Sequence, residues 1–194
     1  MRTLQKFLFY MSSFMPLYVL LFIQNFQFKD INGDISLKRV SEQFDFSNTT
    51  VSFFWWGLIV LFCFSLIGCL LFFFVYTKKN GVKSKMNDAE FVREDTMGYI
   101  VTYIVPLLSI QVDSQRSLIV NLLLFVIIGT FYVKNDQIFM NPIYNLFNYN
   151  VFSTEKGIYI TKISKYKLKN IVRYNLDVYK INVLADIYVL KEAK

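Results

Sequence analysis

The chain of 194 residues contains no histidine and only two cysteines. Without histidine it lacks the side chain that most often acts as a general base or binds a metal ion near neutral pH. Both cysteines, Cys63 and Cys69, fall within one apolar run, where they are most simply packing residues. The sequence contains neither of two glycine-rich phosphate-binding motifs, G-x-x-x-x-G-K-[ST] and G-x-G-x-x-G. We therefore predict that the protein is not an enzyme and holds no metal or cofactor.

Charged side chains are missing from three long stretches, at residues 7–28, 51–77 and 117–133. A helix needs about 20 apolar residues to cross a bilayer, where its backbone must be hydrogen-bonded internally. A fourth stretch, residues 97–112, is shorter and can either span the bilayer or re-enter it. The sequence therefore predicts an α-helical integral membrane protein with four transmembrane helices in residues 1–133. Since no ionisable side chain lies in the spans, a transporter or pump is disfavoured.

Positive charge is in excess, with 21 Lys and Arg against 14 Asp and Glu and a formal net charge of +7. Under the four-span topology, 17 of the 21 cationic residues fall on one side of the membrane and four on the other. Cytoplasmic loops carry an excess of Lys and Arg. We therefore predict that both termini and the loop at residues 78–96 are cytoplasmic.

After the last span the pattern changes to short pieces with β-branched residues and alternating polarity. Strands are predicted at 149–153, 157–163, 170–174, 178–184 and 186–190. Gly157, after Glu155 and Lys156, supplies the positive φ that a hairpin turn needs. Residues 134–194 are therefore predicted to form a small cytoplasmic β-rich (α+β) tail domain.

Two further groups of residues suggest contacts. Small side chains share one face of the second span and allow a helix of a second copy, or of the same chain, to approach closely: Ser65, Gly68 and Cys69. The tail carries a row of cations that we interpret as the polar face of a sheet beneath an anionic leaflet, with nucleic acid or protein as the other candidates: Lys162, Lys165, Lys167, Lys169 and Arg173.

Two stretches resemble a known family. They are Tyr99-Ile-Val-Thr-Tyr103-Ile-Val-Pro106-Leu and Asn141-Pro142-Ile-Tyr-Asn-Leu-Phe-Asn-Tyr149-Asn-Val-Phe152. Both are similar to the membrane subunit of the bacterial Kiwa anti-phage defence system. The four-span layout with a β-rich tail extends the resemblance over nearly the whole chain. Asn148 stands where the family pattern favours glycine, but asparagine tolerates a left-handed backbone better than most residues.

The second stretch also has a physical interpretation. Asn141 can cap backbone groups at the membrane exit, and Pro142 prevents the preceding helix from continuing. Asn141, Pro142 and Tyr149 are therefore predicted to form a stiff joint between the spans and the tail. Pro106 is predicted to kink the third span.

The resemblance implies a homo-oligomeric sensor or scaffold in the bacterial inner membrane, which detects phage-induced perturbation of the envelope. It also implies a cytosolic DNA-binding subunit that this protein recruits or regulates. The expected partners are thus further copies of the chain, that subunit and the lipid bilayer, without direct contact to nucleic acid. The alternative is a pore-forming effector that depolarises the infected cell, for which Ser117, Asn121 and Thr130 supply a polar stripe on the last span.

Overall fold

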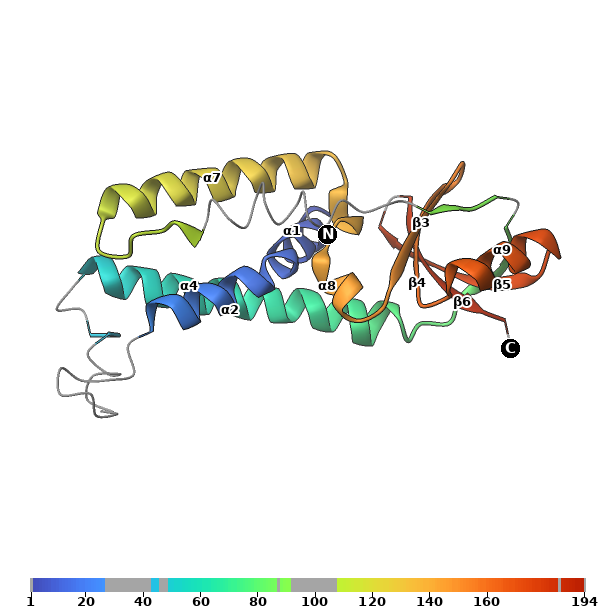
Figure 1. Cartoon of the computed structure of the whole chain (residues 1–194), viewed down its shortest axis with the longest axis horizontal. Helices are drawn as coiled ribbons and strands as arrows, with labels where there is room; N and C mark the ends of the chain where they lie inside the picture. Colours follow the sequence, from blue (N-terminus) through green and yellow to red (C-terminus); the bar gives the residue numbers. More distant parts are fainter. Residues whose placement is uncertain are drawn as a thin grey trace.

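The computed structural model describes residues 2–26, 43–45, 49–86, 88–91, 108–184 and 186–193. The molecule is elongated, with the long helices gathered at one end and the sheet, together with α9 (Lys165–Arg173), at the other (Figure 1). Within the described residues, two helices are long and apolar enough to cross a membrane, and one bent helix pair meets the same test when it is counted as one span.

The bent pair occupies the first predicted span and consists of α1 (Arg2–Ser13) and α2 (Met15–Asn25), which meet at an angle of 45°. The first predicted span is therefore bent near Phe14 and is not one straight helix within the described residues 7–26. Pro16 lies in the first turn of α2 and has no N–H to donate to the carbonyl of Ser12, one turn earlier. The helical hydrogen bonding is thus interrupted around Phe14, which is where the chain bends.

The second and last predicted spans are single long helices. α4 (Thr49–Leu70) continues without a break into the π-helix η1 (Leu71–Tyr76), and α7 (Gln115–Lys134) covers the last predicted span. The 28 residues of α4 and η1 extend about 42 Å at 1.5 Å per residue, which exceeds the roughly 30 Å of bilayer hydrocarbon. Most of the predicted third span, with Pro106 and its kink, lies outside the described residues.

Six strands form one sheet in the order β1-β5-β6-β4-β3-β2. Their bounds are β1 Val82–Lys85, β2 Glu90–Phe91, β3 Asn150–Thr154, β4 Gly157–Thr161, β5 Asp177–Leu184 and β6 Ile187–Glu192. β4 and β6 pair in parallel, and the other neighbours pair antiparallel. The predicted hairpin joins β3 to β4, with Gly157 at φ 127°. A side chain at Gly157 is also excluded by space, because a Cβ there would lie 2.2 Å from the carbonyl oxygen of Asp186.

The outermost strands, β1 and β2, come from the segment between α4 and α7 and not from residues 134–194. Each pairs with a strand of the tail, β1 with β5 and β2 with β3. The sheet therefore draws on two separate parts of the chain. The short, polar sequence of β1, Val-Lys-Ser-Lys, has too little apolar alternation to indicate a strand, so pairing with the tail determines its conformation.

The strand predicted at residues 170–174 is wrong, because these residues belong to α9 (Lys165–Arg173) and the turn after it. The Ser164 hydroxyl caps this helix by accepting a hydrogen bond from the Lys167 N–H, with 3.4 Å between oxygen and nitrogen. Leu168 and Ile171 are spaced three residues apart and are both buried. This helical spacing outweighs the β-branched composition.

The two faces of the sheet have different neighbours. Val151 and Ile160 are buried in the same hydrophobic cluster as residues of α1, η1 and α7. Phe152 and Tyr159, the next positions along each strand, pack in a second cluster with Leu168 of α9. The sheet thus lies between the helices on one face and α9 on the other (Figure 1).

Candidate functional site: the joint between helices and sheet

The chain passes from α7 to the sheet through a short, partly buried segment, which we call the joint and define as residues 141–149. It contains the five-residue helix α8 (Pro142–Leu146), preceded by Asn141 and followed by Asn148 and Tyr149. Between α7 and the joint lies one turn of 3₁₀ helix, η3 (Gln137–Phe139). Asn141 is 1% exposed and Tyr149 is 8% exposed. Residues 141–144 and Tyr149 are therefore part of the protein interior, whereas residues 145–148 are exposed.

Asn141 connects the joint to the first helix through its side-chain amide. Its Nδ2 donates to the Ser12 Oγ in α1 at 2.9 Å, and its Oδ1 accepts from the Ile143 N–H at 3.0 Å, which caps α8. The Ser12 hydroxyl donates in turn to the carbonyl of Phe9 at 2.8 Å. Both Asn141 and Ser12 are buried, so these hydrogen bonds have little competition from water. The hydrogen bond between the uncharged side chains of Asn141 and Ser12 thus holds α8 against α1.

Aromatic rings connect the joint to the end of the long α4–η1 helix. Phe72 of η1 contacts Tyr144 of α8, with ring centroids 4.4 Å apart, and Tyr149 at 5.6 Å. Phe73 contacts Tyr149 at 5.8 Å and Phe147 at 4.7 Å. A π-helix adds a residue to the helical turn and so changes which side chains face a given neighbour. Through η1, two adjacent phenylalanines both face the joint.

The end of the joint has the backbone geometry that the sequence indicates. Asn148 has φ 58°, in the left-handed region, which asparagine adopts more readily than most residues. The Tyr149 N–H donates to the carbonyl of Tyr144 at 2.8 Å, which closes the turn into β3. Burial raises the pKa of the Tyr149 phenol, and a hydrogen bond with Thr77 opposes that rise. Lys162 lies over the Tyr149 ring, 4.9 Å from its centroid.

The predicted packing residues of the second span lie against the chain's own first helix pair. A Cβ added to Gly68 would be 2.3 Å from the carbonyl oxygen of Leu8 in α1. Ser65 is fully buried, and the Cys69 Sγ lies 3.8 Å from the Met15 Sδ in α2. Of the two partners that the sequence allows, the structure supplies the one within the same chain.

A second close contact was not predicted. Gly129 of α7 faces Tyr10 of α1, because a Cβ on Gly129 would lie 2.7 Å from a ring carbon of that tyrosine. The Tyr10 hydroxyl donates to the carbonyl of Phe125 in α7. The sequence feature that could have indicated this contact is Gly129 itself, because a glycine within an apolar run allows another helix to approach closely. α1 therefore packs closely on both α4 and α7 and also holds the joint.

Comparison with known proteins places the chain in a family. Residues 5–189 match the family model described as "Anti-phage protein KwaA". The chain belongs to the KwaA family of anti-phage proteins. One curated relative, the Kiwa protein KwaA of Escherichia coli O55:H7 (strain RM12579 / EPEC), is 28% identical over 107 residues, which are 55% of this chain and 53% of that protein. No solved structure matches the chain. The family resemblance drawn from the sequence is thus confirmed.

The cations singled out in this KwaA family member do not all belong to one element. Four of them, Lys165, Lys167, Lys169 and Arg173, belong to α9, on the sheet face that points away from the other helices. Lys162 precedes α9 and lies over Tyr149 of the joint. The interpretation of the row as the polar face of a sheet is therefore wrong for the four residues of α9, and the contact of these cations with lipid, nucleic acid or protein stays a prediction.

The polar residues of α7 use their own helix for hydrogen bonding. The Asn121 amide donates to the carbonyl of Ser117 at 2.9 Å, and the Thr130 hydroxyl donates to the carbonyl of Val126 at 2.9 Å. Among the residues that the structure describes, no group of three His, Cys, Asp or Glu side chains is placed to hold a metal ion. What the arrangement offers this KwaA family member is rigid contact between helices and sheet.

Proposed function

We propose that this KwaA family protein is a non-enzymatic, multi-pass component of the bacterial inner membrane in anti-phage defence. It forms a homo-oligomer, responds to perturbation of the envelope, and recruits or regulates a cytosolic DNA-binding subunit of the same system. The joint carries the signal from helices to sheet, and the contact of Asn141 with Ser12 is the observation that supports this role most directly.

The orientation follows from the cations at the helix ends. Lys78 and Lys79 come just after Thr77, the C-cap of η1, and Lys134 ends α7, and both helix ends lie on the side of the sheet (Figure 1). Lysines next to the end of a span favour the cytoplasmic side. The sheet and α9 are therefore cytoplasmic, where they are accessible to a cytosolic partner.

Transmission requires that a movement of the helices moves the joint. α1 packs through the close contact at Gly68 on α4, through Tyr10 on α7 and through Ser12 on the joint. A change in the angle of α1 cannot be absorbed at these places without breaking a buried contact, because protein interiors are close-packed. The tail thus moves as one rigid unit when the packing of the helices changes. Two arrangements of the tail that differ in affinity for the partner suffice for regulation.

The outer face of α9 is the proposed docking surface, which we define as Tyr166, Lys169, Arg173 and Tyr174. Tyr166 is 77% exposed and Tyr174 is 64% exposed. Lys169 is also exposed, and the Arg173 guanidinium lies 5.7 Å from the centroid of the Tyr174 ring. Arginine and tyrosine are enriched in protein interfaces, and the cations select an acidic surface on the partner. α9 faces away from the helices, so this surface is directed toward the cytosol.

Reversing the charge of the docking surface tests whether this surface binds the cytosolic subunit. The double variant Lys169→Glu, Arg173→Glu is expected to lose co-purification of the cytosolic subunit from gently solubilised membranes, because two attractive contacts become repulsive. Mass spectrometry of the purified complex, with and without nuclease, identifies what is retained, and its size gives the oligomeric state.

The control is Lys156→Glu with Lys85→Glu, which changes the net charge equally at exposed positions outside α9. This control is expected to retain the partner. If the α9 variant retains the subunit as well as the control does, α9 is not the docking surface. If a nuclease releases the subunit from the unmodified protein, nucleic acid and not α9 holds the two together.

A further inference from the structure

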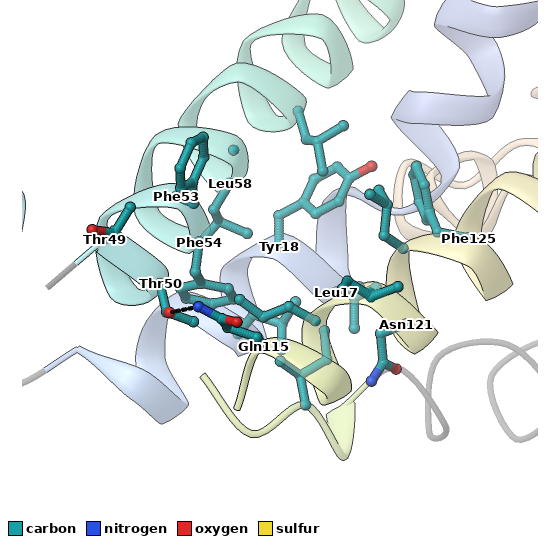
Figure 2. Close-up of a pocket in the computed structure, with 17 residues that line it drawn as sticks. Leu17, Tyr18, Thr49, Thr50, Phe53, Phe54, Leu58, Gln115, Asn121 and Phe125 are labelled. Carbon is teal, nitrogen blue, oxygen red and sulfur yellow. Dashed lines mark hydrogen bonds between the residues drawn. The ribbon is translucent and has the colours of Figure 1, made fainter. Parts of the chain in front are cut away.

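An apolar pocket of about 520 Å³ lies between α2, α4 and α7, at the end of the helices farther from the sheet (Figure 2). Leu17 of α2, Phe54 and Leu58 of α4, and Phe125 of α7 form much of its wall. Ligand sites commonly have about 300–1,000 Å³, mostly apolar walls and a few placed polar groups. The pocket has the dimensions of a binding site for an apolar group.

Thr49, Thr50 and Gln115 place polar side chains at one end of the pocket, and Tyr18 and Asn121 line it farther along. The Gln115 Nε2 donates to the Thr50 Oγ1 at 3.3 Å, and the two residues lie in the first turns of α7 and α4 (Figure 2). Leu58 is eight residues farther along α4 than Thr50, a rise of about 12 Å. One leaflet has roughly 15 Å of hydrocarbon, half of a whole bilayer. The pocket thus extends from the polar boundary through most of one leaflet.

The opening of the pocket is itself apolar and exposed. Phe53, Ile119 and Leu122 line the pocket and are 68%, 59% and 60% exposed. If α4 and α7 cross the bilayer, these residues face hydrocarbon and not water. Apolar cavities do not hold water well, because water needs two or more polar partners. The group that fills this space without loss is therefore an acyl chain from the surrounding lipid.

We propose that the pocket binds one acyl chain of a phospholipid from the leaflet farther from the sheet, with the polar part of the lipid beside Thr50 and Gln115. The proposal rests on the membrane placement given under Proposed function. The acyl chain contacts Leu17 and Tyr18, in the half of the bent pair that is farther from the joint. Lipid occupancy therefore affects the packing of α2 against α4 and α7.

Gly57 provides a direct way to fill the pocket. It lines the pocket, and a Cβ added to it would meet nothing within 4 Å. Gly57→Leu therefore places four carbons in the space of the acyl chain without moving a helix. Leu122→Trp, at the exposed opening, is a second variant that obstructs the pocket from another helix. Ile67→Phe is the matched control, since it adds bulk to an exposed position of α4 that does not line the pocket.

The full chain is reconstituted in vesicles of phosphatidylethanolamine and phosphatidylglycerol with a trace of phosphatidylethanolamine that carries a diazirine on its acyl chain. After photolysis, peptide mass spectrometry locates the lipid adducts. We expect adducts on pocket residues of α2, which are lost in Gly57→Leu and Leu122→Trp and retained in Ile67→Phe. Adducts on the outer face of α7, at Val126 and Ile127, are expected in every variant because both residues are more than half exposed.

Two results would overturn the inference. If α2 carries no adduct while Val126 and Ile127 do, or if both pocket variants keep the α2 adducts, the pocket does not bind lipid, although the membrane placement stands. If neither the pocket nor the outer face of α7 is labelled, the membrane placement itself is wrong.

Discussion

Gly68→Ala is expected to lower the thermal stability of the protein sharply, whereas Gly57→Ala in the same helix is expected to preserve or raise it. A Cβ at Gly68 would lie 2.3 Å from the Leu8 carbonyl oxygen and 3.1 Å from the Ser12 Cβ, and the same atom at Gly57 meets nothing within 4 Å. The obstacle at Gly68 is helix backbone, so α1 and α4 must separate by about 1 Å to reach an ordinary C···O contact of roughly 3.3 Å. Overpacking of this kind costs about 1–3 kcal/mol, and backbone contact favours the upper end.

The measurement is the temperature at which half of the detergent-solubilised protein leaves its monodisperse chromatographic peak. Alanine at an ordinary helical glycine position gains about 0.5–1 kcal/mol from reduced backbone entropy, so the two variants should differ in sign. Gly129→Ala should resemble Gly68→Ala, because its Cβ would meet the Tyr10 ring at 2.7 Å. Equal stability of the Gly68 and Gly57 variants would contradict the close packing of α1 on α4.

The two long helices could be predicted from the sequence because their uncharged runs alone indicate a helix. The uncharged runs at 51–77 and 117–133 correspond to α4 with η1 and to α7, since an apolar helix of this length has few alternatives. The break at Phe14 could also have been predicted, because Pro16 lies inside the first run. The length and apolar composition of that run, taken without the proline, predict only a single span. The partner of the small residues around Gly68 was not readable, because composition does not distinguish a helix of the same chain from one of a second copy.

The joint and the sheet were predictable only in part. Asn141, Pro142 and Asn148 have the cap, the first helical turn and the left-handed backbone that their types favour. Ser12, which completes the contact, is 129 residues away from Asn141 in the chain, and no local pattern connects the two. β1 and β2 depend equally on distant partners. β-branched Ile171 and Val172 favour a strand at residues 170–174, whereas the cap at Ser164, which was not considered, indicates the start of α9.

The proposed docking surface and the proposed route of transmission occupy different parts of this protein and can be tested separately. The docking surface lies on α9, across the sheet from the helices, and the joint lies on the other face. A variant of the docking surface is therefore expected to lose the partner. A variant of the joint is expected to keep the partner and lose the response.

Asn141→Ser is expected to abolish protection of cells against phage while the protein still inserts in the membrane, folds and retains its partner. Serine is as good an N-cap as asparagine, so the hydrogen bond to the Ile143 N–H can persist. Its shorter side chain has no amide to donate to the Ser12 Oγ, so the contact between α1 and α8 is lost. Asn141→Ala removes both functions of the side chain and should cost about 1 kcal/mol more in stability than serine does, which is the usual contribution of a cap. The readouts are plaque counts on cells that express the defence system, partner retention and thermal stability.

A double-mutant cycle determines whether the contact exists and how strong it is. Ser12→Ala removes a small buried hydroxyl, and combined with Asn141→Ala it should show a coupling free energy of about 0.5–1.5 kcal/mol, the usual net value of one hydrogen bond. Zero coupling would mean that Asn141 and Ser12 do not contact each other in the membrane. A measurable coupling together with full protection by Asn141→Ser would mean that the contact is structural and that the signal reaches the sheet by the aromatic contacts of Phe72 and Phe73 with Tyr149. Loss of protection with the partner retained places the transmission step at the hydrogen bond between α1 and α8.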